Sequence, residues 1–167
     1  MTIKCWNMYS SRAKICVPAF DVDGDMVGLI YRNLLTEKPK YLYSESFPKK
    51  GLLFGINHCE KTVPYVILVE GVFDCIWLWQ NGYISLAVLG SHLSDKQFDD
   101  LICLTDTIYL CGDNDLAGRN FNKDAYNRLI GARRDVEVVK FEGFKDVQEM
   151  DSKTVKGVMN RYASQNF

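Results

Sequence analysis

The run Val66-Ile67-Leu68-Val69-Glu70, together with the Gly71 that follows it, decides the fold that the sequence predicts. Four consecutive apolar residues that end in a carboxylate are typical of a parallel strand buried on both faces. An apolar run of helical length follows at 72–80, and Asp74 lies near its start. This stretch therefore predicts a strand–turn–helix unit that carries Glu70 and Asp74 at the carboxyl end of the strand.

The same alternation continues along the chain. The pattern predicts further strands at 84–88, 107–111 and 136–141, and helices at 73–81, 94–102, 116–130 and 154–164. Strands separated by helices favour a parallel sheet with helices on both faces, so we expect an α/β fold. Ser94 is a suitable N-cap for the second of these helices.

The part of the chain before this sheet has a different pattern. Strand-like runs at 15–21 and 26–32 flank Asp21-Val22-Asp23-Gly24-Asp25, and Asp-Gly between two such runs indicates a β-hairpin. The carboxylate spacing also resembles the opening of a calcium loop. Met26 and Arg32 stand where such a loop needs glycine and glutamate, which favours the hairpin.

These patterns divide the chain into three parts. We expect a small basic, β-rich N-terminal subdomain at 1–59, which includes a short apolar strand at 52–54. An α/β domain at 60–150 follows, and a C-terminal helix occupies 151–167.

Composition narrows the class of protein. The chain has 167 residues, of which 47% are hydrophobic, so it can bury a core. It has no run of 18 uncharged apolar residues and no signal-peptide pattern, so we expect a cytoplasmic location and no membrane contact. The six cysteines are scattered without a C-x-x-C pair, which disfavours a zinc site and favours a reducing compartment. A net charge of −1 does not favour a protein that binds nucleic acid with its whole surface.

Carboxylates follow three of the predicted strands. Glu70 ends the first strand, Asp113 and Asp115 follow the strand at 107–111, and Asp146 follows the strand at 136–141. Like charges about 4 Å apart repel by roughly 4 kcal/mol at an effective dielectric constant near 20, so such a cluster needs a cation or protonation. Mg²⁺ is usually held by one or two carboxylates together with substrate phosphates. The alternative is a solvated acidic turn with Asp115 at the N-terminus of the next helix.

Three acidic motifs resemble those of the Toprim domain, which bacterial-type primases, type IA and type II topoisomerases and some nucleases share. Glu70-Gly71-Val72-Phe73-Asp74 is similar to the glutamate motif of that domain. Asp113-Asn114-Asp115-Leu116-Ala117-Gly118-Arg119 resembles its D-x-D motif in the A-G-R version that primases carry. Lys145-Asp146-Val147-Gln148-Glu149 is similar to the K-D-x-x-E ending of phage primase–helicases and departs from the D-P-D form of bacterial primases.

The upstream segment resembles the part of primases that precedes the Toprim domain. The resemblance begins with Arg12-x-Lys14-Ile15-x-x-Pro18. Lys40-Tyr41-Leu42-x-Ser44 is similar to the primase K-Y-L-N-S motif, with Tyr43 at or beside the asparagine position. Lys50-Gly51-x-Leu53-Phe54-Gly55 resembles K-G-x-x-L-Y-G. The match covers about residues 12 to 150, and it implies a Toprim fold preceded by the small basic subdomain.

The resemblance implies the catalytic core of a primase, a DNA-dependent RNA polymerase that makes short RNA primers. Glu70, Asp113 and Asp115 are then catalytic, and together with Asp146 they hold Mg²⁺, or alternatively Mn²⁺. The residues that the resemblance places in contact with nucleotide or nucleic acid are Lys14, Arg32, Lys40, Tyr41, Lys50, Asp74 and Arg119. The implied partners are a single-stranded DNA template, ribonucleoside triphosphates, and a replicative helicase or zinc-binding module supplied in trans. A phage-encoded chain would act inside a bacterial host cell.

Two other functions remain open from the sequence. A Toprim-type nuclease would use the same carboxylates to activate water, but the primase-like upstream segment would then be unexplained. A non-catalytic Toprim module that binds a replication partner would have no reason to keep a costly cluster of carboxylates.

Overall fold

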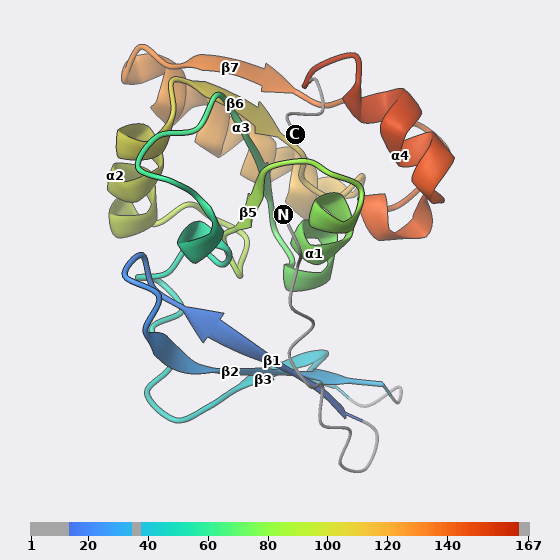
Figure 1. Cartoon of the computed structure of the whole chain (residues 1–167). Coiled ribbons are helices and arrows are strands. Elements are labelled where there is room, and N and C mark those ends of the chain that lie inside the picture. Colours follow the sequence, from blue (N-terminus) through green and yellow to red (C-terminus); the bar gives the residue numbers. More distant parts are fainter. Residues whose placement is uncertain (1–13, 35–37, 164–167) are drawn as a thin grey trace.

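The computed structural model describes residues 14–34 and 38–163, and it contains two separate sheets (Figure 1). The first is antiparallel, in the order β1-β2-β3, and comprises β1 (Lys14–Phe20), β2 (Met26–Asn33) and β3 (Tyr41–Tyr43). The second is parallel, in the order β5-β4-β6-β7, and comprises β4 (Val66–Val69), β5 (Ser85–Ala87), β6 (Thr107–Leu110) and β7 (Asp135–Val138). The predicted α/β fold with a β-rich segment before it is confirmed.

Four α-helices connect or follow the parallel strands. They are α1 (Val72–Gln80), α2 (Asp95–Leu104), α3 (Leu116–Gly131) and α4 (Ser152–Met159). Two short 3₁₀ helices, η1 (Ile56–His58) and η2 (Val147–Glu149), lie in the connecting segments. No helix in the described part of the chain is long and apolar enough to span a membrane.

The strand order creates a crevice between β4 and β6. From β4 the chain runs through α1 to β5 on one side, then crosses back through α2 to β6 on the other side. Because such crossovers are right-handed, α1 covers one face of the sheet, and α2 and α3 cover the other (Figure 1). Arg128 of α3 pairs with Asp95 of α2 at 2.8 Å, which places these two helices side by side. In such sheets, ligands bind where the strand order reverses, at the carboxyl ends of the strands.

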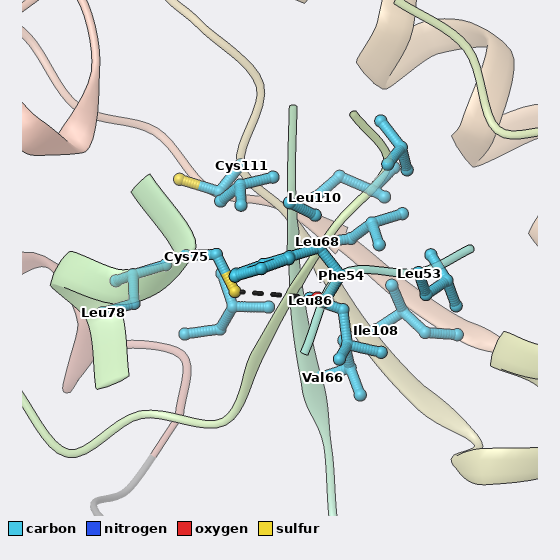
Figure 2. Close-up of a cluster of buried hydrophobic side chains, with 14 of the residues drawn as sticks. Leu53, Phe54, Val66, Leu68, Cys75, Leu78, Leu86, Ile108, Leu110 and Cys111 are labelled. Atoms are coloured by element: carbon cyan, nitrogen blue, oxygen red, sulfur yellow. Dashed lines mark hydrogen bonds between the residues drawn. The ribbon is translucent and has the colours of Figure 1, made fainter. Parts of the chain in front are cut away.

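The core lies between the parallel sheet and its helices. The central strand β4 is apolar throughout, and all four of its residues are buried, whereas the edge strand β7 alternates acidic and apolar residues. Figure 2 shows side chains of the central strands meeting those of α1 and of the segment before η1. The residues labelled there are Leu53, Phe54, Val66, Leu68, Cys75, Leu78, Leu86, Ile108, Leu110 and Cys111. Full burial of a leucine or isoleucine contributes about 1.5–3 kcal/mol, so this cluster is a main source of stability.

The turn between β1 and β2 is the predicted hairpin. The two strands pair antiparallel, and Gly24 adopts a left-handed φ of 87°. The Asp21 carboxylate accepts hydrogen bonds from the backbone N–H groups of Asp23 and Asp25, at 3.1 and 3.0 Å. The first aspartate therefore stabilises the turn as an acceptor for backbone donors.

Some predicted element boundaries were wrong. The segment 52–54 forms no strand, because only Phe54 makes a bridge, to Ala87. The strand expected at 136–141 ends at Val138, since its neighbour β6 ends at Leu110 and leaves little to pair with.

The last helix also differs from the prediction. It begins at Ser152, because Asp151 caps it by accepting a hydrogen bond from the Thr154 N–H at 2.7 Å, and it ends at Met159. The whole segment 1–13, which includes Arg12, lies outside the described residues, as do 35–37 and 164–167.

Candidate active site

A pocket of about 350 Å³ opens at the carboxyl ends of the parallel strands. Its wall combines tyrosines of β3 and lysines from the segments before and after that strand with carboxylates from α1 and from the ends of the parallel strands. The lining residues are Lys40, Tyr41, Tyr43, Lys49, Glu70, Gly71, Val72, Asp74, Leu89, Gly90, Asp113 and Asp146. Six of the predicted site residues are therefore brought together here: Lys40, Tyr41, Glu70, Asp74, Asp113 and Asp146.

The carboxylates reach the pocket from three successive strand ends. Glu70 directly follows β4, Asp113 follows β6, and Asp146 precedes η2 after β7. The backbone N–H of Asp113 donates a hydrogen bond to Glu70 Oε1 at 3.1 Å, which joins the first two motifs. Because β4 and β6 are adjacent parallel strands, their carboxyl ends bring Glu70 and Asp113 to the crevice between them.

Burial and mutual repulsion raise the pKa values of these acids. The pKa of Glu70 is raised mainly by burial, and further by the charges of Asp113 and Asp115. The pKa of Asp113 is raised by burial first and then by Asp146, while the Lys145 ammonium, 3.9 Å from Asp113 Oδ2, opposes the shift. The site therefore binds protons more readily than isolated carboxylates do, and it would also attract a cation.

Asp74 is the most perturbed of the pocket acids. Burial, followed by the charges of Asp146 and Asp113, raises its pKa to about 7. Asp74 is only 8% exposed. Its Oδ1 is buried without a hydrogen-bond partner. A Cβ at position 71 would lie 2.5 Å from Asp74 Oδ2, so Gly71 is needed for the aspartate to approach the backbone here.

The donor set fits a hard divalent ion that completes its coordination with substrate. Within residues 14–34 and 38–163, no group of three or more Asp, Glu, His or Cys side chains is arranged to hold a metal ion. Mg²⁺ requires fewer protein ligands, because it keeps waters and binds through one or two carboxylates and phosphate oxygens. The unpartnered Oδ1 of Asp74 and the carboxylate of Asp113, both at the pocket wall, are oxygen donors of the required kind.

Asp115 does not line the pocket. It is the N-cap of α3, and its Oδ1 accepts a hydrogen bond from the Gly118 N–H at 3.0 Å. This is the alternative role that the sequence left open for the second carboxylate of the D-x-D motif. Its charge still raises the pKa of Glu70, so Asp115 contributes to the negative electrostatic potential of the pocket.

A cation–aromatic cluster holds Tyr41 at the pocket wall. Arg32 Nη1 donates a hydrogen bond to the Tyr41 hydroxyl at 2.6 Å, and its guanidinium lies 5.0 Å from the centroid of the Tyr41 ring and 5.4 Å from that of Phe73. Burial raises the pKa of Tyr41 to about 12, so this hydroxyl stays protonated. Phe73 belongs to α1, so the cluster also joins the antiparallel sheet to the α/β part.

The other predicted contact residues lie outside the pocket lining. Lys14 begins β1, where it pairs with Asn33. Arg119 is exposed in the first turn of α3. Lys50 is exposed, and the structure places its neighbour Lys49 in the lining in its place.

Sequence reasoning did not select two of the polar residues that line the pocket. Lys49 and Tyr43 line the pocket, and the Lys49 ammonium lies 4.9 Å from the centroid of the Tyr43 ring. The Lys-Lys and Tyr-x-Tyr pairs were visible in the sequence, but pattern alone could not choose between their members. Asn114 and Glu149 connect the second and third acidic motifs.

This connection runs through Lys145. The Asn114 N–H donates to the Lys145 carbonyl at 2.6 Å, and the Lys145 N–H donates to Glu149 Oε2 at 2.7 Å. The Glu149 N–H in turn donates to Asp146 Oδ1 at 3.2 Å. Glu149 therefore holds the turn that carries Asp146, and it is absent from the pocket lining.

Comparisons with known proteins agree with this geometry. The Toprim-like family model matches residues 67–151, just over half of the chain. A DNA primase of Clostridium acetobutylicum is 32% identical over 156 residues, which cover 90% of this chain and 26% of that protein. A DNA primase of Rickettsia prowazekii is 37% identical over 123 residues, which cover 69% of this chain and 20% of that protein.

A solved structure extends the comparison to the fold. The crystal structure of the Aquifex aeolicus primase, comprising its zinc-binding and RNA polymerase domains, superimposes with a TM-score of 0.74 at 29% identity. The match covers 89% of this chain and 40% of that one. The chain spans about a quarter of the length of the curated relatives it matches. With its acidic motifs at three strand ends and its matched residues 67–151, the chain belongs to the Toprim-like family.

Proposed function

We propose that this chain is the catalytic core of a DNA primase, which joins ribonucleotides into short primers on single-stranded DNA. The observation that carries the proposal is one pocket in which carboxylates from three strand ends face lysines from the segments directly before and after β3. Carboxylates that could hold divalent ions, set opposite cations that could bind phosphates, suit phosphoryl transfer. The similarity to bacterial DNA primases over most of the chain supports the same activity.

Each part of the wall has a role in this proposal. Lys40 and Lys49 bind and orient the triphosphate as compact ammonium groups. Glu70 and Asp113 lie beside the reacting phosphate, and Glu70, whose pKa is raised by burial, accepts the proton of the attacking 3′-hydroxyl. Tyr41, held by Arg32, limits the pocket on the side of the antiparallel sheet.

The same acids would hold Mg²⁺, or Mn²⁺ in its place. Asp113 is the main ligand of the ion in this proposal, and Glu70, Asp74 and Asp146 lie near enough to add negative charge. Asp115 would attract the ion by its charge without contacting it. When bound, the ion would neutralise the phosphate charge and stabilise the attacking and leaving oxygens.

The partners follow from the same activity. They are a single-stranded DNA template and ribonucleoside triphosphates, with a zinc-binding module or a replicative helicase in trans. Lys14, Lys50 and Arg119, which lie outside the pocket lining, would contact the template backbone. The division of the chain into parts at 1–59, 60–150 and 151–167 also stays a prediction.

A primer-synthesis assay tests the proposal. The purified chain is incubated with single-stranded DNA, labelled ribonucleotides and Mg²⁺ or Mn²⁺, with and without an added zinc-binding module. We expect short RNA products that disappear with Glu70→Gln or Asp113→Ala. Asp99→Asn is the matched control, because Asp99 is an exposed acid of α2 outside the pocket lining.

The assay also separates the other two functions. Degradation of a labelled template without RNA synthesis would support a nuclease. Neither product, even with the zinc-binding module present and with a folded chain by circular dichroism, would support a non-catalytic module and contradict the proposal.

A further inference from the structure

One buried side chain supports the pocket from behind without lining it. Gln97 of α2 is 1% exposed, and its side-chain carboxamide makes all its hydrogen bonds to backbone groups. Its Oε1 accepts from the Ser94 N–H at 3.0 Å, which completes the capping box of α2. A capping box needs only this acceptor, so the other half of the carboxamide is available for a second task.

The Nε2 of Gln97 holds two separate segments together. It donates to the Leu52 carbonyl at 2.7 Å and lies 3.4 Å from the Lys49 carbonyl, both in the loop before η1. It also donates to the Val88 carbonyl at 2.9 Å, directly after β5. The Ser94 hydroxyl adds a hydrogen bond to the Lys50 carbonyl of the same loop.

Both segments carry residues of the pocket wall. Lys49 comes from the first segment, and Leu89 and Gly90 come from the second. A Cβ at position 90 would lie 3.8 Å from Lys49 Cε, so the lysine stem runs along Gly90. Its ammonium then lies over the Tyr43 ring, 4.9 Å from the centroid.

The backbone of the second segment needs such support. Leu89 has a φ of 60°, in the left-handed region that non-glycine residues rarely adopt. Strained backbone of this kind persists only where the surroundings hold it. The hydrogen bond from Gln97 to the carbonyl of the preceding residue is one of these constraints.

We propose that Gln97 is a positioning residue for the pocket: its carboxamide fixes the loop of Lys49 against the end of β5 and thereby places the Lys49 ammonium over Tyr43. Its effect on nucleotide binding rests on the function proposed above, whereas the placement of Lys49 does not. A shift of this loop would move the lysine away from the carboxylates it faces across the pocket.

The placement is tested by NMR, independently of any activity. Lysines of the full chain are converted to ¹³C-dimethyl-lysine, which keeps their charge, and the Lys49 signal is assigned by its loss in Lys49→Arg. The Tyr43 ring should shift this signal away from those of exposed lysines, and Tyr43→Leu should remove the shift. We expect Gln97→Met to move the signal in the same direction as Tyr43→Leu does.

Two further variants make the result decisive. Thr105→Val removes a buried hydroxyl at the opposite end of α2, so it controls for general loss of stability and should leave the Lys49 signal in place. Gln97→Glu keeps the acceptor for Ser94 but loses the donor, and it replaces Gln97→Met if that variant does not fold. A Lys49 signal that stays unchanged in a folded Gln97 variant overturns the proposal.

The kinetic consequence is a selective effect on nucleotide binding. Gln97→Met should raise the KM for ribonucleotides by about tenfold, the size expected from weakening one hydrogen bond to a charged group, while kcat stays within about twofold. In a Lys49→Ala background the same substitution should add nothing. If the two substitutions raise the KM by factors that multiply, Gln97 acts on nucleotide binding through a residue other than Lys49.

If no primer synthesis is observed at all, the proposed primase function is contradicted. The NMR result still decides whether Gln97 places Lys49.

Discussion

Some residues of the site lower the stability of the fold and at the same time face the ligand pocket. Asp74 is buried beside Asp113 and Asp146, which is unfavourable for a charged aspartate, yet the pocket places it where an ion or phosphate would bind. Gly71 makes this arrangement possible by leaving room for the carboxylate. A residue that lowers stability while facing a ligand pocket is typical of functional sites.

Asp74→Asn should stabilise the metal-free protein at neutral and higher pH. The pKa of Asp74 is raised from 3.8 to about 7 in the folded chain, so the unfolded chain releases this proton first as the pH rises. The free energy of unfolding therefore falls between about pH 4 and pH 7, by at most about 4 kcal/mol at about 1.4 kcal/mol per pKa unit. Asparagine stays neutral and avoids this loss.

Urea denaturation in EDTA at pH 4, 6 and 8 would measure this difference. We expect the two proteins to be equally stable at pH 4 and the variant to be more stable at pH 8, while its activity is reduced. Parallel pH profiles for both proteins would contradict the raised pKa.

Among the elements, α3 depends most closely on the acidic turn before it. Asp115 caps the helix, and Gly118 in its first turn packs against the backbone of Asp113. A Cβ at position 118 would lie 2.0 Å from the Asp113 carbonyl oxygen, a distance that no side chain can accommodate. The small residue of the A-G-R motif is therefore explained by packing against the D-x-D turn.

Gly118→Ala should destabilise the protein by about 3 kcal/mol and displace Asp113. Gly157→Ala is the matched control, because Gly157 lies inside α4 and the added Cβ would meet no atom within 4 Å apart from its chain neighbours and the helix's own backbone. That control should raise stability by about 0.5–1 kcal/mol through helix propensity. Thermal melts of both variants would measure the difference, and a Gly118→Ala protein as stable as the wild type would show that the turn can move freely.

At the level of the complete fold, the pocket depends on two sheets that come from different parts of the sequence. The antiparallel sheet supplies Tyr41 and Tyr43, and the parallel sheet supplies the carboxylates. The stacked side chains of Arg32, Tyr41 and Phe73 lie across the boundary between them. An ion bound by the acids should therefore stabilise the folded chain as a whole.

Mg²⁺ should raise the melting temperature of the chain at pH 8. At ten times the dissociation constant, a ligand of the folded state adds about 1.4 kcal/mol, which corresponds to about 3–5 °C for a chain of this size. Asp113→Ala should abolish the increase, and Asp99→Asn should retain it. An equal increase in Asp113→Ala would place the binding of the ion elsewhere.

Much of this architecture could be predicted from the sequence because it depends on local pattern. The apolar run before Glu70 and the Asp-Gly turn after Asp21 each specify a nearby structure, and the capping of α2 by Ser94 follows from its first turn. The order of the acidic motifs along the chain also predicted that carboxylates would gather at one sheet edge. Boundaries were less accurate where a neighbouring strand or a cap decided them, as at Val138 and Asp151.

The choice between neighbouring residues required the three-dimensional fold. Adjacent lysines 49 and 50 have the same chemistry, and only the folded arrangement of the loop before η1 shows that Lys49 lines the pocket and Lys50 does not. Likewise, Asp113 and Asp115 look equivalent in the D-x-D motif, yet the start of α3 turns the second into a cap. Pattern along the chain depends on near neighbours, so it predicts elements and their order. Which side chain faces a pocket depends on contacts between segments far apart in the sequence, and these exist only once the chain has folded.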